Sequence, residues 1–214
     1  MCGCYELKAK AKALNRQFRQ LHIGQREMPC SHEMQPGNPV LMITGTPHGH
    51  IASNAKWGLV GRFLNAAPLK PVTTLCGEGL ASKPFYSKIL KNNRCLIPAT
   101  AFHEWQILNG NQQKIRISHS QNEPLIFAGI FDHHPLAGTT CAILTTAANG
   151  PMRAIHQRMP VLLSRDECSF WLEEHTEFPE AEFEAMLQTA SVDALTMEEI
   201  AVEAPSPQMS FGFA

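Results

Sequence analysis

The N-terminal tripeptide Met1-Cys2-Gly3 carries the most distinctive reactive group in the sequence. A small second residue normally allows the initiator methionine to be removed, which would leave Cys2 with a free α-amine and a thiol on adjacent carbons. Because the pKa of an α-amine lies near ~7.7–8.0, part of it is neutral and nucleophilic at neutral pH. Such an aminothiol can condense with an aldehyde and close a thiazolidine ring, or its thiol can attack an amide. The alternative is a cysteine that merely happens to be second.

Two further residues are candidates for proton transfer. Glu104 stands among bulky aromatic residues in the segment Phe-His-Glu-Trp at 102–105. Burial among apolar neighbours raises the pKa of a carboxyl group towards the range useful to a general acid or base. His156 can shuttle protons, and the nearby Arg158 can hold a phosphate with two parallel hydrogen bonds. An exposed strand position for Glu104 and a purely structural role for His156 fit the pattern equally well.

The cysteines argue against a disulfide framework and against a metal centre. There are seven of them, an odd number, and the N-terminus has no signal-peptide pattern, so we expect reduced thiols. A metal site built from Cys2, Cys4, Cys30 and His32 is an alternative, but their spacing differs from that of common zinc sites. We therefore predict no metal and no cofactor.

Composition and charge indicate a globular, cytoplasmic protein with an uneven distribution of charge. Hydrophobic residues make up 44% of the 214 positions, and no apolar run is long enough to span a membrane. Residues 1–165 contain all 18 Lys and Arg residues, whereas 12 of the 19 Asp and Glu residues lie in 166–214. A basic body is typical of a surface that binds a polyanion. Attraction between the two regions within one neutral molecule explains the pattern equally well.

Many short β-type runs and few helical patterns predict an α+β fold. We expect a single domain over residues 1–203, with a mixed, largely antiparallel, barrel-like core and flanking helices, and a loose tail over 204–214. A capping box at Ser164–Glu167 predicts a helix that continues to Glu174. The other predicted helices cover 7–21, 85–91 and 180–189. The predicted strands cover 39–44, 51–59, 94–97, 101–108, 113–118, 124–131, 139–147 and 159–163.

Several short motifs, in their order along the chain, resemble the SRAP family, the SOS-response-associated peptidase-like proteins that process abasic sites in DNA. The motifs are Met1-Cys-Gly3, Trp57-Gly-Leu59, Lys83-Pro-Phe85, Arg94-Cys-Leu-Ile-Pro98, Phe102-His-Glu-Trp105, Phe127-Ala-Gly-Ile-Phe-Asp132, Leu144-Thr-Thr-Ala-Ala-Asn149 and Ile155-His-Gln-Arg-Met-Pro160.

The resemblance implies a monomer with a positively charged channel for single-stranded DNA. It also implies that Cys2 forms a thiazolidine crosslink with the ring-opened aldehyde of an abasic site and so shields the lesion during the DNA damage response. Glu104 then corresponds to the family's acid/base glutamate, and His156 to its second proton-transfer residue, which is also linked to crosslink reversal. The DNA-bound form would be associated with the nucleoid. We expect no general peptidase activity beyond the removal of Met1.

The sequence departs from the family pattern at positions that contact DNA in the family. Cys4 replaces an arginine, and Thr74 and Cys76 replace an asparagine and an arginine before Lys83. Asn65 lies upstream and is a candidate to replace the lost asparagine.

Other residues are candidates to compensate for these losses. Phe63 stands near the family's tryptophan and is a candidate wedge against a base. The candidate phosphate contacts are Arg62, Arg94, Arg153 and Arg158.

Two alternative functions remain open at this point. A degenerate family member would bind single-stranded DNA or a protein partner without forming a crosslink. The second alternative is an N-terminal-nucleophile amidotransferase, because such enzymes also begin Met-Cys-Gly. Of the other motifs of these enzymes, only an Asn-Gly pair for the oxyanion hole is found, at Asn109-Gly110.

Overall fold

The computed structural model describes residues 3–8, 14, 21–23, 28–66, 68–108, 110–173, 178–189 and 194–201. Its strands form two sheets, and the smaller one is antiparallel throughout. In spatial order the smaller sheet contains β13 (Leu195–Ile200), β9 (Asn111–His119), β8 (Ala101–Leu108), β1 (Cys4–Leu7) and β3 (Ser31–Met34).

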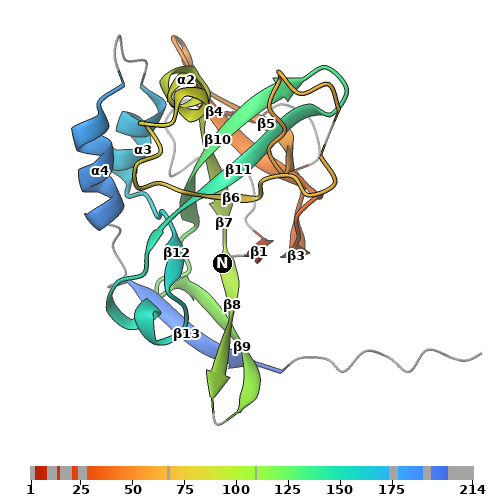
Figure 1. Cartoon of the computed structure of the whole chain (residues 1–214). Coiled ribbons are helices and arrows are strands. Elements are labelled where there is room, and N and C mark those ends of the chain that lie inside the picture. Colours follow the sequence, from red (N-terminus) through yellow and green to blue (C-terminus); the bar gives the residue numbers. More distant parts are fainter. Residues whose placement is uncertain are drawn as a thin grey trace, which may run out of the picture.

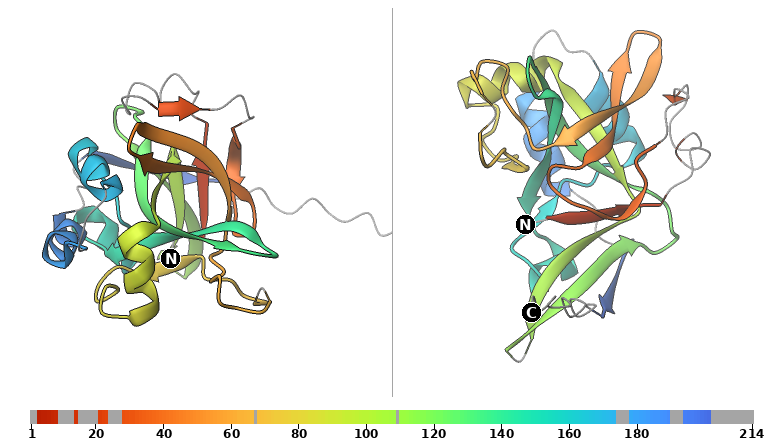
Figure 2. Two further views of the ribbon diagram at one scale, coloured as in Figure 1. Left: turned by 90° about the horizontal axis from the view of Figure 1, so that it is seen from above. Right: turned by 90° about the vertical axis from the view of Figure 1, so that its right-hand side faces the viewer.

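The larger sheet curls back on itself. Its order is β12 (Arg158–Pro160), β11 (Gly138–Ala147), β10 (Leu125–His134), β7 (Arg94–Ala99), β4 (Pro39–Thr46), β5 (Gly49–Trp57) and β2 (Leu21–Ile23), and β6 (Thr74–Cys76) pairs with β11. An additional pairing of β11 with β5 closes the strands β11, β10, β7, β4 and β5 into a ring, so the core is barrel-like (Figures 1 and 2). The predicted α+β class with a largely antiparallel, barrel-like core is confirmed.

Strand β7 is buried at every position because it has a hydrophobic core on each side. Successive side chains of a strand point to opposite faces. Cys95 and Ile97 therefore enter the core inside the curled sheet, which contains Phe127. Leu96 points to the other face and packs in a second core with Trp171 beneath the helices. Only Thr100 separates β7 from β8, so the chain passes directly from one sheet into the other.

Three α-helices and a short 3-10 helix, η1 (Gly150–Ala154), accompany the sheets in the described residues. Helices α3 (Arg165–Leu172) and α4 (Glu180–Thr189) lie on one side of the larger sheet, and α2 (Pro84–Asn92) covers one end (Figure 1). The predicted capping box is present: the Ser164 amide donates to Glu167 at 2.7 Å, and the Glu167 amide donates to the Ser164 hydroxyl at 3.3 Å. Helix α3 ends at Leu172, before the predicted end, because Glu173 adopts an extended backbone.

The other sequence predictions divide into three groups. The eight predicted strands and the helices at 85–91 and 180–189 are observed with small shifts of their ends. The short strands β1, β2, β3, β6 and β13 were not predicted. Most of the predicted helix at 7–21 and all of the tail 204–214 lie outside the described residues, and Leu7 belongs to β1 rather than to a helix. In the described part of the chain, no helix is both long and apolar enough to cross a bilayer.

The structure contradicts the prediction that Arg94 contacts DNA, because its guanidinium lies inside the protein. The residue is only 7% exposed. It donates to the carbonyl oxygens of Trp171 at 2.6 Å and Lys91 at 2.8 Å, and to those of Leu90 and Glu173. These carbonyls belong to the C-terminal ends of α2 and α3, which have no partners within their own helices. One arginine thus joins the ends of two helices.

We predict that Arg94→Met destabilises the fold by about 3 kcal/mol or more, because it leaves buried carbonyl groups without donors. Urea unfolding of the variant and the wild type measures this difference. Arg94→Lys provides the control for charge alone, and we expect it to be destabilised too, since one ammonium group cannot reach both helix ends. A loss below about 1 kcal/mol in Arg94→Met would contradict this role.

Candidate functional site

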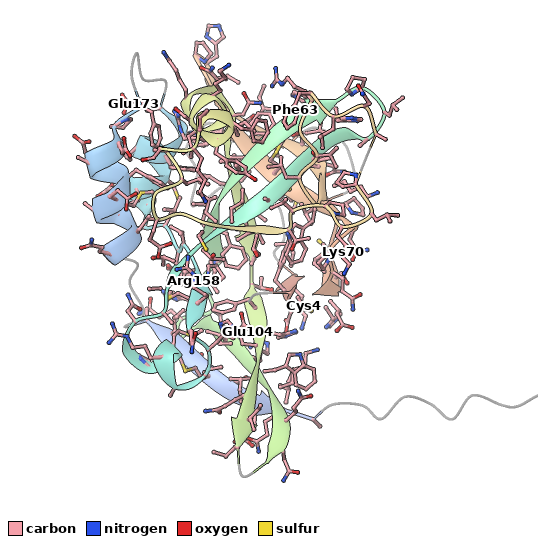
Figure 3. The ribbon with its side chains drawn as sticks, viewed as in Figure 1. Cys4, Phe63, Lys70, Glu104, Arg158 and Glu173 are labelled. Atoms are coloured by element: carbon pink, nitrogen blue, oxygen red, sulfur yellow. The ribbon has the colours of Figure 1, made fainter. Side chains whose placement is uncertain are left out.

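The pairing of β1 with β8 determines where the N-terminal end of the described chain lies. Cys4 pairs with His103 and Glu6 pairs with Ala101, in antiparallel register. The chain before Cys4 is therefore directed along β8 towards Glu104. Figure 3 shows Cys4 and Glu104 near one another at β8. Cys2, the predicted nucleophile, lies outside the described residues.

Glu104 is a buried carboxylic acid at this position. Its side chain lies on the same face of β8 as Phe102, which enters the core, and the residue is only 3% exposed. Burial raises the pKa of Glu104, and the charge of His156 acts in the opposite direction. The structure therefore brings together the two predicted proton-transfer residues. A carboxyl group with a raised pKa can hold a proton for delivery near neutral pH.

A side chain of β8 also positions the segment that carries His156. Gln106 lies on the same face of β8 as Glu104 and donates from Nε2 to the carbonyl oxygen of Ala154 at 2.8 Å. Ala154 is the last residue of η1. The amide of Arg158 donates to His156 Nδ1 at 2.9 Å. The carbonyl oxygen of Arg158 also lies 2.9 Å from Nδ1, so the backbone of Arg158 holds this side of the ring and Nε2 is the nitrogen that can exchange a proton with a substrate.

Arg158 makes a bidentate ion pair with Glu78, so its guanidinium group is already occupied by a carboxylate. Nη1 and Nη2 each lie 2.7 Å from a carboxylate oxygen of Glu78, and Nη2 also donates to the Thr145 carbonyl at 2.7 Å. Burial alone would raise the pKa of Glu78, but hydrogen bonds from Arg158 and from backbone amides lower it to about 2. Glu78 is therefore ionised at neutral pH, and it neutralises the predicted phosphate contact.

The remaining predicted DNA contacts fall into two places. Thr74 begins β6 and pairs with Ile143 on β11, the strand whose far end pairs with Arg158. Arg153 lies in η1 and donates from Nε to the carbonyl oxygen of Ala148 at 2.9 Å. Thr74 is thus on a strand that, like β12 with Arg158, pairs with β11, and Arg153 precedes His156 by three residues.

Arg62, Phe63 and Asn65 lie elsewhere. Figure 3 shows Phe63 near the top of the view, well above Glu104 and Arg158. Arg62 is ion-paired with Asp132 at 2.6 Å, and Asn65 is exposed in the following turn. The structure therefore does not bring these three residues to the Glu104–His156 pair, and the role of Phe63 as a wedge against a base stays a prediction.

The sequence analysis missed a polar cluster on the other face of β1 and β8. Cys4 Sγ lies 3.3 Å from His103 Nδ1, and His103 Nε2 lies 2.9 Å from Glu6 Oε1. Arg116 and Lys8 contact the same carboxylate at 2.8 Å and 2.9 Å. The available signal was the alternation within residues 4–7, where Cys4 and Glu6 share one strand face, but residues 4–6 were given no element and Leu7 was placed at the start of a helix.

The cluster keeps Cys4 protonated and Glu6 ionised. Burial and the nearby Glu33 carboxylate raise the pKa of the Cys4 thiol to about 11, so the thiol can serve as a hydrogen-bond donor to His103. Burial would raise the pKa of Glu6, but hydrogen bonds from Arg116, Lys8 and His103 lower it to about 2. Cys4 is thus a structural thiol that fastens β1 to β8. In the described residues, no group of three potential ligands converges on a metal position.

We predict that Glu6 makes the stability of the protein depend on pH. The folded-state pKa is about 2, against an ordinary value of 4.5. A depressed carboxyl pKa contributes stability above the ordinary value, about 3 kcal/mol here, which is lost as the pH falls through the folded value. Glu6→Gln should therefore be less stable than the wild type at neutral pH, and the difference should shrink between pH 4.5 and 2.

Urea unfolding across this pH range measures the effect. The exposed residue Glu123 provides a matched control as Glu123→Gln, for which no such difference is expected. A constant offset between Glu6→Gln and the wild type at every pH would contradict the assignment of this linkage to Glu6.

Comparison with known proteins places this site in a family context. The family model described as SOS response associated peptidase (SRAP) matches residues 1–205. The abasic site processing protein YoqW of Bacillus subtilis (strain 168) is 27% identical over 217 residues, covering 97% of this chain and 96% of YoqW. The abasic site processing protein HMCES of Gallus gallus is 30% identical over 152 residues, covering 58% of this chain and 45% of HMCES.

Solved structures show the same fold. A crystal structure of a protein from Bordetella bronchiseptica has a TM-score of 0.78 at 20% identity, covering 94% of this chain and all of that one. A second, from Bacteroides thetaiotaomicron, also has a TM-score of 0.78, at 21% identity, covering 94% of this chain and 92% of that one. The resemblance expected from the sequence motifs is confirmed, and the chain belongs to the SRAP family of SOS response associated peptidases.

Proposed function

We propose that this chain processes abasic sites in single-stranded DNA by forming a thiazolidine crosslink through Cys2. One observation carries the proposal: the register of β1 on β8 directs the N-terminal end of the chain towards a buried glutamic acid that is electrostatically coupled to His156. The named relatives are abasic site processing proteins, which supports DNA with abasic sites as the substrate. The protein would act as a monomer in the cytoplasm, and at the nucleoid when it is bound to DNA.

The reaction needs only acid/base chemistry and two nucleophiles. Glu104 protonates the ring oxygen of the abasic sugar, the bond between this oxygen and C1 breaks, and the C1 hydroxyl returns its proton to Glu104 as the aldehyde forms. The neutral α-amine of Cys2, exposed after removal of Met1, adds to the aldehyde carbon, and Glu104 protonates the hydroxyl group of the adduct, which leaves as water and gives a protonated Schiff base. The Cys2 thiol loses its proton to His156 Nε2 or to Glu104 and attacks the same carbon, which closes the thiazolidine ring. Proton return along the same path would reverse the reaction.

The electrostatics of the site favour weak binding of DNA. Arg158 is paired with Glu78, and Arg94 is buried at two helix ends. Each phosphate contact that is lost in this way makes the salt dependence of single-strand binding shallower by roughly 0.7 in the log–log slope. This neutralisation favours, as a second candidate function, a protein that binds single-stranded DNA without forming the crosslink.

We predict that the mature protein forms a covalent adduct with an abasic oligonucleotide. The substrate is a uracil-containing single strand treated with uracil glycosylase, and intact mass spectrometry reads both the loss of Met1 and the mass of the adduct. The adduct should resist heat, because a thiazolidine contains two new bonds to the former aldehyde carbon.

Two variants test the origin of this adduct. Cys2→Ser should abolish the heat-stable product, because a hydroxyl group is a far weaker nucleophile for ring closure than a thiol. Cys30→Ser should leave it intact, since Cys30 is an exposed thiol outside the site. Removal of Met1 without any adduct would reject the crosslinking proposal in favour of the binding-only candidate.

We predict opposite effects of Glu104→Gln on activity and on stability. Loss of the general acid should slow crosslinking by about 10²–10⁴-fold. A carboxyl pKa raised by burial means that the ionised form destabilises the folded protein at high pH. The variant should therefore be more stable than the wild type above the raised pKa, and this advantage should vanish below the ordinary value of 4.5.

Adduct formation and urea unfolding, each measured across pH, check both effects. The crosslinking rate of the wild type should fall as the pH rises through the pKa of Glu104. The rate of the variant should not show this decrease. A variant that crosslinks at the wild-type rate would remove Glu104 from the mechanism.

A further inference from the structure

The carboxylate of Glu78 joins the ends of two strands beside His156. Glu78 lies in the turn after β6. Its carboxylate accepts hydrogen bonds from the Ala147 amide at 2.9 Å and the Thr146 hydroxyl at 3.2 Å, both at the end of β11. It also binds both terminal nitrogens of Arg158, the first residue of β12, at 2.7 Å. The chain between these two strand ends carries η1 and His156, so one carboxylate holds together the base of the loop that presents the histidine.

Arg158 links this carboxylate directly to the ring of His156. The backbone amide and the backbone carbonyl of Arg158 each lie 2.9 Å from His156 Nδ1. The amide can donate to an unprotonated Nδ1, and the carbonyl can accept from a protonated one. The backbone of Arg158 therefore holds the ring in either state, while Nε2 exchanges protons with the substrate. Whatever fixes Arg158 also fixes the orientation of His156.

The turn that carries Glu78 is itself held by helix α4. The amide of Gly79 donates to Glu184 Oε1 at 3.0 Å, and the hydroxyl of Ser82 donates to Glu180 Oε1 at 3.3 Å. Glu78 is exposed, but its bidentate geometry and its bonds to β11 distinguish it from a simple surface ion pair. It can therefore act as a support for Arg158, because the turn behind it is fixed by contacts that do not involve Arg158.

We infer that Glu78 is a positioning residue for crosslinking: through Arg158 it holds the ring of His156 where Nε2 can take the thiol proton of Cys2. The inference rests on the proposed function, because it assumes that His156 transfers a proton during ring closure. The same ion pair withholds Arg158 from the DNA backbone. Glu78 should therefore have two opposite effects, since it supports the chemistry and weakens the binding of the strand. A residue that served folding alone would not show this split.

The test uses Glu78→Gln in the full chain, which keeps the size of the side chain and removes its charge. At a saturating concentration of abasic single strand, crosslinking should slow by roughly 10–10²-fold, because a small displacement of a reacting group is costly. Undamaged single-stranded DNA should bind more tightly, and its log–log salt slope should become steeper by roughly 0.7, because Arg158 becomes available to one phosphate. Glu182→Gln removes an exposed charge from α4 as the matched control, and it should leave the crosslinking rate and the salt slope unchanged.

A double-variant cycle with His156 tests the route of the effect. Glu78→Gln should slow crosslinking in the wild-type background but not in a His156→Gln background, where the group that it positions is absent. Equal slowing in both backgrounds would overturn the inference, and so would a Glu78→Gln protein that crosslinks as fast as Glu182→Gln. If Glu78→Gln does not fold, Glu78→Asp replaces it, because the shorter carboxylate keeps the charge but cannot reach both strands, and the same pattern of rates is expected.

A second measurement separates failure of this inference from failure of the proposed function. A wild-type protein that loses Met1 and forms no adduct would reject the crosslinking proposal. The nitrogen NMR signals of the His156 ring, recorded without DNA and assigned with His156→Gln, test the positioning independently of any adduct. Glu78→Gln should change the ratio of the two ring tautomers, whereas Glu182→Gln should not. An unchanged ratio in Glu78→Gln would overturn the inference.

Discussion

The arrangement of the site depends on one buried carboxylate, Glu6, which fastens β1 to the rest of the smaller sheet. An isolated buried carboxylate would be strongly destabilising, and such groups are tolerated only when they are paired. Here Arg116, Lys8 and His103 surround it, and His103 Nδ1 also contacts the Cys4 thiol. Because Cys4 and Glu6 lie on the outer face of β1, Tyr5 and Leu7 point into the core. The same register directs the N-terminal end of the chain towards Glu104.

On the inner face of β8, the surroundings of Glu104 shift the pKa of its carboxyl group in the direction opposite to that of Glu6. Glu6 is surrounded by cations and is held ionised, whereas Glu104 is buried beside apolar residues, with His156 opposing the rise of its pKa. The two residues lie on paired strands but on opposite faces of one sheet, so each has its own electrostatic environment. A carboxylic acid that costs stability when it ionises is typical of catalytic positions, where function requires what folding disfavours.

In the described part of the chain, several arginines make their contacts within the protein. Arg94 joins two helix ends, Arg62 holds Asp132, and Arg158 holds Glu78. Each of these pairings makes the local structure more rigid, and each removes a positive charge that a phosphate could have used.

The sequence alone determined the fold class, most strands, the capping box of α3 and the identity of the candidate acid, because these depend on local periodicity, capping chemistry and short motifs. It did not determine short strands such as β1 and β13, which contain too few residues to show a clear period and exist through pairing with distant strands. Nor did it separate Arg94 from Arg153, since a guanidinium that fills a buried helix end and one at the surface have the same local sequence signal. Only the tertiary structure decided which arginines are neutralised, that Phe63 lies far from Glu104, and that Cys4 faces His103. These outcomes depend on residues distant in sequence that meet only when both sheets are assembled.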